Sequence, residues 1–427
     1  MHQGSKTRLW GGGYPLWLAS DTAFELASAL AGFAVPLLAL MITDEPVLAG
    51  IIGATGLVMR MVSSLVGGVL ADRHSRVALM LVGALVGIVL AVVFTALTFL
   101  DLLGYVALLL LNLGFAFRNG LFGTANQSAL KDVVAPDAFG RAQASNQGRD
   151  AVMSLAGSPL GGVLLGLGAP ILGGVMAISQ LVAAVSAAAL RRRTPAVPVG
   201  HGGSERRRFG AELAEGFRWV FSRPDLRGTL LVTTLINLGF NAAISTVVYS
   251  LQQAGSSPTA IGLVTGGLGV GMLLGAALAP VLVPRVPTGW LGIGGVLLVA
   301  VAMAVMPLVT HPLAVAVVLA VAVLGAPALN AALLGYFMVA TPREVIGRAT
   351  SALSVFAMGA MPLAPLVAGF GLTWVGRSGT LLATAAICLA AAALAALTSS
   401  LRRLPVEADW GRHAEAQSRE LVEPRVG

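Results

Sequence analysis

The chain has 427 residues, of which 56% are hydrophobic and only 11% are charged, and its mean hydropathy is +0.86. Soluble domains carry about 25% charged residues, so this composition excludes an ordinary soluble protein and predicts an integral membrane protein. The formal net charge of +8 would suit a nucleic-acid binder, but the basic residues gather at one set of ends of the hydrophobic runs, so we expect no nucleic-acid partner.

Twelve runs are long and apolar enough to cross a bilayer, which takes about 20 residues. The excess of arginine and lysine on one side of these runs, Arg141 and Arg149 included, predicts that this side is cytoplasmic. We therefore expect a multi-pass protein of a bacterial cytoplasmic membrane, with both termini in the cytoplasm. In chain order the runs are 14–42, 47–70, 77–100, 104–130, 145–168, 170–190, 228–251, 258–283, 289–310, 312–340, 350–374 and 378–399.

A linker rich in arginine, glycine and proline divides the runs into two groups of six. Within it, Phe209, Leu213 and Phe217 recur at helical spacing among charged residues. This pattern is typical of an amphipathic helix on the inner membrane surface, or of a solvated linker helix. The predicted parts are an N-terminal six-helix bundle, the linker, a C-terminal six-helix bundle and a cytoplasmic tail, at residues 1–190, 191–227, 228–399 and 400–427.

The two groups share the positions of their prolines and glycines. Pro46 and Gly50 at the start of the second run match Pro258 and Gly262 in the eighth, each 212 residues later. Such matching is typical of a duplicated transporter. At the same offset, acids and arginines of the first group align with uncharged residues of the second. We therefore expect ion coupling to be centred in the N-terminal half.

Four charged residues lie well inside the predicted spans, away from the ends of the runs: Asp21 and Glu25 in the first, Arg60 in the second and Arg118 in the fourth. Charges are costly to insert into a bilayer, so each is a functional candidate, the alternative being ion pairs that lock helices together. Asp21 and Glu25 share one helix face, and two carboxylates that close cannot both ionise cheaply. One of them is expected to bind a proton. Arginine keeps its proton, so we expect each to need a counter-charge or an aqueous cavity.

The stretch from Gly68 to Val77 forms the turn between the second and third runs and contains Leu-Ala-Asp-Arg-His-Ser-Arg. It resembles the corresponding loop of the major facilitator superfamily, with Ser75 in place of a glycine. The resemblance implies twelve transmembrane helices in two six-helix repeats. It also implies a conformational latch, in which the loop aspartate, Asp72, pairs with Arg141 and caps the start of the eleventh run near Arg348; a solvated surface pair is the alternative. The latch residues are Gly68, Asp72, Arg73, Arg76 and Arg141.

The fifth run contains Gly157, Pro159, Gly161 and Gly162, which resemble the Gly-Pro-x-x-Gly-Gly motif of antiporters in this superfamily. Proline bends a helix and small residues allow close helix contact, so the motif is expected to seal the protein against proton leak; generic packing is the alternative. Together with short patterns in the first run, the fourth run and the linker, it makes the chain similar to the drug:proton antiporter branch, which includes bacterial macrolide and siderophore exporters.

Amide side chains fall where a central cavity would be lined, namely Asn237, Asn241 and Asn330, although such residues also hold helices together.

The expected function is proton-coupled export of amphipathic small molecules by a monomer in the lipid bilayer. The proton gradient would supply the energy, without a cofactor. Alternatives are a lipid or lysophospholipid flippase or importer, and a non-transporting sensor or assembly partner. The sequence has no phosphate loop, Cys/His cluster or nucleophile elbow, so we expect neither an enzyme nor a metal site.

Overall fold

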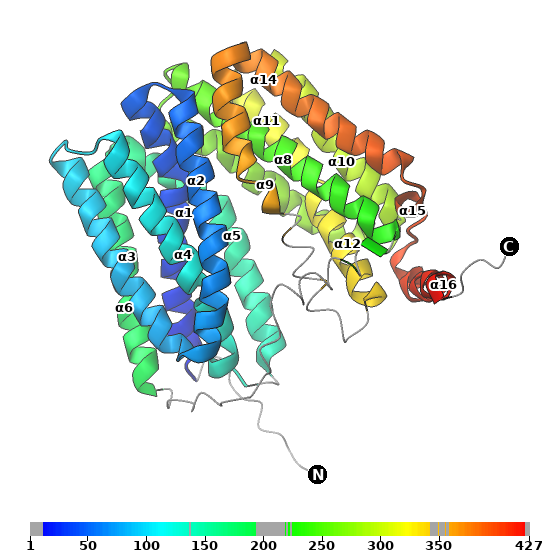
Figure 1. Ribbon diagram of the computed structural model, residues 1–427, viewed down its shortest axis with the longest axis horizontal. Helices are drawn as coiled ribbons and strands as arrows, with labels where there is room; N and C mark the ends of the chain where they lie inside the picture. The colour runs from blue at the N-terminus through cyan, green and yellow to red at the C-terminus, as the bar shows by residue number, and fades with distance from the viewer. Residues whose placement is uncertain are drawn as a thin grey trace, which may run out of the picture. The chain divides into compact units, whose positions relative to one another are not determined.

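The computed structural model describes residues 12–135, 138–193, 218, 221, 222, 224–341, 349, 355 and 358–422. These residues are almost entirely helical (Figure 1), which confirms the predicted all-α class. They group into two compact units. The first unit consists of Met1–Gly202 and Val248–Gly266, and the second of Gly203–Val247 and Gly267–Gly427.

Six long helices build most of the first unit, and short turns join them. Helix α1 lies at the centre, since it contacts α2, α4, α5 and α6, while α2 packs on α4 and α3 packs on α6. This position explains why Leu30, Ala34 and Leu37 of α1 are completely buried. The helices are α1 (Tyr14–Thr43), α2 (Pro46–Arg73), α3 (Arg76–Phe99), α4 (Tyr105–Val133), α5 (Phe139–Leu167) and α6 (Ala169–Arg193).

The second unit is built around α10, which contacts α11, α12, α14 and α15. Helices α8 and α9 contribute to both units, because the end of α8 and the start of α9 belong to the first. The helices are α8 (Pro224–Gln253), α9 (Pro258–Leu282), α10 (Thr288–Val305), η3 (Met306–Leu308), α11 (Pro312–Val323), α12 (Ala326–Ala340), α14 (Leu363–Leu397), α15 (Ser399–Arg402), η4 (Glu407–Asp409) and α16 (Trp410–Val422).

Within the described residues, 11 helices are long and apolar enough to cross a membrane. One of them, α14, contains two of the predicted spans. Its backbone leaves the helical region at Gly376 (φ 68°, ψ −177°), a conformation that suits glycine. The arm before Gly376 is the described part of the predicted eleventh span, and the arm after it corresponds to the twelfth (Figure 1). The predicted architecture of twelve spans in two repeats is therefore confirmed.

The repeat is visible in the helix boundaries. Pro46 begins α2 and Pro258 begins α9, and proline suits this first position because its missing N–H would have no partner there.

Ser75, the departure from the superfamily loop pattern, has a clear local role: its Oγ accepts a hydrogen bond from the backbone N–H of Ala78 at 3.4 Å. Ser75 thereby caps the start of α3, as serine commonly does.

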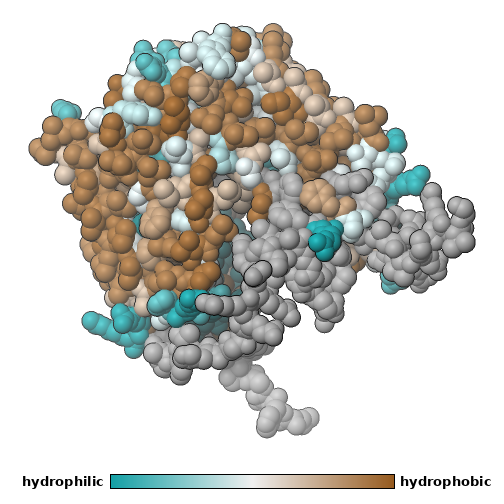
Figure 2. All heavy atoms as spheres, viewed as in Figure 1, coloured by the Kyte–Doolittle hydropathy of each residue, from teal (hydrophilic) through white to brown (hydrophobic). Residues whose placement is uncertain are grey.

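Large apolar side chains cover the outer flank of α3. Figure 2 shows hydrophobic residues along this flank and hydrophilic ones at its ends. Unpartnered apolar surface of this extent is what a bilayer would cover. The large apolar residues exposed on α3 are Val82, Leu85, Val86, Val89, Val92, Val93 and Phe99.

Part of the predicted organisation lies outside the described residues. This holds for Phe209, Leu213 and Phe217 of the expected linker helix, and for Arg348 of the expected latch. The predicted tail contains α15, η4 and α16, and α16 packs against α12 within the second unit.

Candidate functional site

The first unit contains a cavity of about 480 Å³. Asp21 and Glu25 of α1, Arg60 of α2 and Arg149 of α5 contribute charged side chains to it. Three of the four charges that the sequence places inside spans therefore meet in one cavity. Among the described residues, no three His, Cys, Asp or Glu side chains are grouped to hold a metal ion. The remaining lining residues are Trp17, Ala29, Gln127, Leu130, Gln143, Asn146, Asp150 and Met153.

Asp21 is bound to an arginine from a neighbouring helix. The carboxylate is only 2% exposed, and Arg149 donates a hydrogen bond from Nη1 to its Oδ2. Arg149 also donates from Nη2 and Nε to Asp150 Oδ1, at 2.7 and 3.1 Å, and its guanidinium lies 5.8 Å from the centre of the Trp17 ring. Arg149 thus supplies the opposite charge that a buried carboxylate requires.

Glu25, one turn further along α1, is held differently. It is half-buried, and it makes no hydrogen bond or ion pair within the part of the chain that the structure describes. It interacts through its charge with Asp21, Arg60, Arg149 and Asp150. A carboxyl group without a fixed partner can exchange a proton with water in a cavity without first breaking an ion pair.

Arg118 does not line this cavity. Its side chain is 1% exposed; Nε donates to Gly83 O at 2.8 Å, Nη2 to Gln180 Oε1 at 3.0 Å and Nη1 to Asn119 Oδ1 at 3.1 Å. The guanidinium also stands 3.9 Å from the centre of the Phe24 ring. Among the described residues, neutral acceptors and an aromatic face therefore surround Arg118 in place of the ion pair or aqueous cavity that we expected from the sequence, and Glu25 acts on it only through its charge.

Glycine makes the room for this buried arginine. A Cβ atom on Gly87 would lie 2.7 Å from Gln180 Cδ and 2.9 Å from Arg118 Nε. Sequence reasoning did not identify Gln180 as a partner of Arg118. Two signals were present: a single amide among the apolar residues of the sixth span, and the Gly83–Gly87 spacing on one face of the third.

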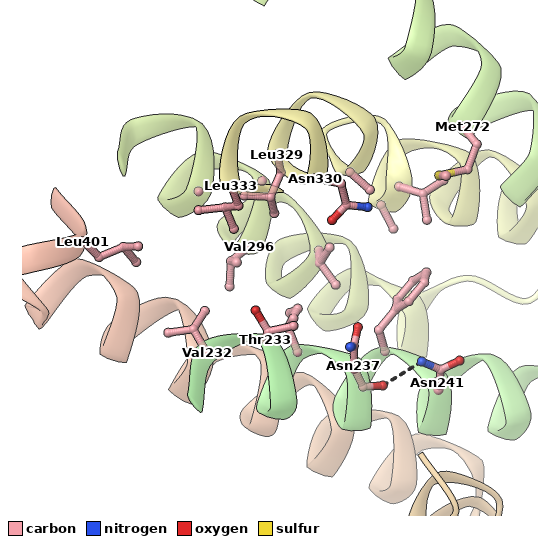
Figure 3. Close-up of a pocket in the computed structure, with 18 residues that line it drawn as sticks. Val232, Thr233, Asn237, Asn241, Met272, Val296, Leu329, Asn330, Leu333 and Leu401 are labelled. Carbon is pink, nitrogen blue, oxygen red and sulfur yellow. Dashed lines mark hydrogen bonds between the residues drawn. The ribbon is translucent and has the colours of Figure 1, made fainter. Parts of the chain in front are cut away.

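The second unit contains a separate cavity of about 310 Å³. The three predicted amides, Asn237 and Asn241 of α8 and Asn330 of α12, all line it (Figure 3). Asn241 Nδ2 donates to the backbone oxygen of Asn237 at 2.8 Å. The other lining residues are Val232, Thr233, Ile236, Phe240, Met272, Gly292, Gly295, Val296, Val299, Ala322, Val323, Ala326, Leu329, Leu333 and Leu401. No charged side chain is among them.

The glycines of the fifth span are contact points on two sides of α5. Gly157 and Gly161 face α1, where added Cβ atoms would lie 3.2 Å from Ala29 Cβ and 3.0 Å from Phe33 Cδ1. On the other side, a Cβ on Gly162 would lie 2.8 Å from the Cα of Gly262 in α9.

Pro159 continues this second contact. It sits inside α5, and its Cγ would be 2.8 Å from a Cβ on Gly266 of α9. The motif residues therefore form a close backbone contact between α5 and the start of α9.

The expected latch residues lie at one end of the first unit. Asp72, Arg73 and Arg141 are exposed. Arg76 Nη1 donates to Asp132 Oδ1 at 2.8 Å, and both side chains are about one-quarter exposed (28% and 27%). Arg76 thus has a partner within its own unit. Because Arg348 lies outside the described residues, the latch stays a prediction.

Arg149 is the main residue that sequence reasoning missed. The predicted fifth span begins at residue 145, which puts Arg149 close to the start of the span, among the arginines of the adjoining loop. The structure begins α5 at Phe139, so Arg149 lies about three turns into the helix. The adjacent Asp150 was a signal that this arginine has an internal partner.

The comparisons with known proteins agree with this architecture. Residues 22–358 match the family described as Major Facilitator Superfamily, while a comparison with curated proteins gave no match. Similar solved structures include a bacterial homologue of the human lysosomal transporter Spinster, with 17% identity, 98% of each chain covered and a TM-score of 0.63.

Two further structures share the fold. A bacterial homologue of the iron transporter ferroportin has 14% identity and a TM-score of 0.71 over 91% of this chain and 98% of that one. A mutant of the nucleoside transporter NupG has 14% identity and a TM-score of 0.63 over 90% of this chain and 100% of that one. The family match spans most of the sequence, so this protein is a membrane transporter of the Major Facilitator Superfamily.

Proposed function

We propose that the protein is a proton-coupled exporter of amphipathic small molecules that works by alternating access. The observation that carries the proposal is the contrast between two carboxyl groups on one face of α1. Asp21 is bound to Arg149, whereas Glu25 lines the same cavity with no ion pair among the described residues. Glu25 is therefore the group that is free to bind and release a proton.

In the proposed cycle Glu25 takes a proton when its cavity is open to the outside of the cell. It gives the proton up when the cavity opens to the cytoplasm, and substrate travels in the opposite direction. Arg60 would favour release by stabilising the carboxylate. The proton gradient supplies the energy, and no cofactor is needed. The fixed charges of Asp21 and Arg149 would shape the field around Glu25 without exchanging protons themselves.

The cavity of the second unit supports the choice of substrate class. Its walls are mostly apolar, with a few amide groups that can donate and accept hydrogen bonds. Cavities of this kind suit a molecule with a large apolar body and a few polar atoms. Asn237, Asn241 and Asn330 would fix the orientation of such a molecule.

Orientation and assembly follow from the sequence. The bias of basic residues supports an orientation with both termini and the linker in the cytoplasm of a bacterial cell, and with the protein in the plasma membrane. The proposal requires one copy of the chain and the lipid bilayer. Asp72, with Arg73, Arg76 and Arg141, would latch one conformation. The glycines and proline of α5 would act as a seal against proton leak.

The test is proton movement in liposomes that contain the purified protein and a pH-sensitive dye. A proton gradient is imposed, and lipophilic cations, macrolides and siderophore-like anions are added in turn. One of these classes should trigger proton movement in the wild type. Glu25→Gln should abolish this movement while the protein stays folded.

Glu45→Gln is the matched control, because Glu45 is exposed and lines neither described cavity. It should transport like the wild type. If folded Glu25→Gln still couples substrate to protons, Glu25 is not the carrier. If the folded wild type shows no substrate-dependent proton movement, the proposal fails in favour of a lipid flippase or a non-transporting role.

A further inference from the structure

The segment after α14 is docked on the second unit. Trp410, the first residue of α16, is 7% exposed, and its Nε1 donates to Thr288 Oγ1 at 2.9 Å. The indole fills a recess on α12 that only glycine leaves open, since a Cβ on Gly335 would lie 2.6 Å from the Trp410 ring. Beside it, the rings of Tyr336 and His413 lie 5.9 Å apart.

The backbone of the same segment completes the start of α10. The N–H of Thr288 donates to Pro405 O at 3.0 Å, and the N–H of Gly289 donates to Leu404 O at 3.2 Å. The first N–H groups of a helix have no partners within that helix, so this segment satisfies donors that would otherwise need water. A Cβ on Gly289 would lie 2.9 Å from Arg402 O, so glycine permits this approach.

One residue of the segment reaches the cavity. Leu401 is 2% exposed and is among the lining residues. Figure 3 shows Leu401 at one end of the cavity, on the same side as Val232 and Leu333. Asn241 and Met272 lie toward the opposite end. Leu401 comes from outside the six-span bundle, so that end of the cavity depends on where the segment is docked.

We infer that residues 398–422, here named the C-terminal clamp, are part of the binding cavity of the second unit. The clamp closes one end of the cavity with Leu401, and Trp410 anchors it. Leu401 is therefore a specificity-determining residue: when the clamp is released, the cavity becomes longer and admits larger molecules. That this cavity takes the transported molecule rests on the proposed function, whereas the closure itself does not.

The test needs a probe inside the cavity and a separate probe of docking. Thr233→Cys, in a chain whose buried Cys388 is changed to Ser, places a single thiol near the Leu401 end. Its rate of modification by a charged methanethiosulfonate reagent reports access to that end. Hydrogen–deuterium exchange at Thr288 and Gly289 reports docking, because both amides are bonded to the clamp.

Three variants separate the effect of anchoring the clamp, of closing the cavity, and of changing an exposed side chain. Trp410→Ala should speed both the exchange at Thr288 and Gly289 and the modification of the cavity thiol by at least about tenfold, the factor that corresponds to ~1.4 kcal/mol of lost docking energy. Leu401→Ala should speed the modification alone. Arg412→Ala, on the exposed side of α16, should change neither. A chain that ends at Ser399 should behave like Trp410→Ala.

Two results would overturn the inference. In the first, Trp410→Ala speeds exchange but leaves the rate of thiol modification unchanged, so the clamp does not close the cavity. In the second, exchange is unchanged, so Trp410 is not the anchor. Neither readout requires transport, and failure of the exporter proposal therefore leaves this test intact.

Discussion

A permanently charged side chain at the centre of a helix bundle requires a specific environment. An arginine at mid-membrane costs about 3 kcal/mol to insert, and it cannot shed its proton. In this protein Arg118 donates three hydrogen bonds, to oxygens of Gly83, Asn119 and Gln180. Its guanidinium also packs on the ring of Phe24. Within the described residues its charge is thus solvated by dipoles without a direct ion pair, and it adds a positive field to the first unit, which Glu25 opposes through its own charge.

This arrangement predicts a clear effect of the acceptor at position 180. Gln180→Leu should lower the free energy of unfolding in mild detergent by about 2 kcal/mol, because hydrogen bonds to charged groups contribute about 1.5–3 kcal/mol. Gln180→Glu has nearly the same shape and offers a carboxylate, so it should retain most of the stability. Equal losses in both variants would mean that Gln180 acts by packing and not as an acceptor.

The two residues of the Asp21–Arg149 pair should differ in how much stability is lost when each is replaced. Arg149→Met leaves a buried carboxylate without a partner and should cost about 3 kcal/mol, whereas Asp21→Asn leaves Arg149 its bonds to Asp150 and should cost less. In the double variant, part of the Arg149→Met loss should be recovered, with a coupling of about 1 kcal/mol or more. Chemical unfolding of all four proteins measures this cycle, and simple additivity would contradict it.

For single residues, the sequence predicts which side chains share a helix face, because residue spacing alone decides this. Asp21 and Glu25 were assigned to one face because four residues make about one helical turn, and both line the same cavity. The partner of Asp21 was not predictable, since it depends on where α5 begins. The environment of Arg118 was not predictable either, because it depends on which helices become neighbours in space.

Among the helices, the contact between α5 and α9 is the closest approach of backbones in the candidate antiporter motif. It makes a sharp prediction for Gly162. Gly162→Ala would place a Cβ 2.5 Å from Pro258 O and 2.8 Å from Gly262 Cα, which are backbone atoms that cannot move alone. The helices must separate, and we expect a loss of about 1–3 kcal/mol, as in overpacked cores.

Gly148→Ala in the same helix is the control, because its Cβ would meet nothing within 4 Å. Replacing a helical glycine where space is free should stabilise by about 0.5–1 kcal/mol. Thermal melting of the two variants in detergent should therefore shift in opposite directions. Shifts of the same sign and size would show that the α5–α9 contact is not tight.

Helix boundaries were largely predictable from hydropathy and proline. Pro46 and Pro258 begin α2 and α9 as expected from their repeat positions. The docking of α16 was not predictable, because a polar helix such as α16 resembles any solvated tail. Its docking depends on Trp410 filling a recess at Gly335. The periodicity of the sequence does not predict a contact between two residues so far apart in the chain.

For the molecule as a whole, the two units carry different chemistry on a repeated architecture. The cavity of the first unit is lined by charged side chains and that of the second by amide and apolar ones. This is the asymmetry that the aligned repeats predicted, with charges at positions where the other half has uncharged residues. If the proposed function holds, proton coupling and recognition of the transported molecule should be separable by mutation.

The separation can be measured as two quantities, the KM for substrate and the number of protons moved per substrate. Asn237→Ala and Asn330→Ala should each raise KM by about three- to tenfold, since a hydrogen bond contributes about 0.5–1.5 kcal/mol, and should leave the proton-to-substrate ratio unchanged. Met272→Leu, which keeps the volume of the same cavity wall, should alter neither quantity. A changed proton ratio in the asparagine variants would mean that coupling extends into the second unit, and that the charges of the first do not carry it alone.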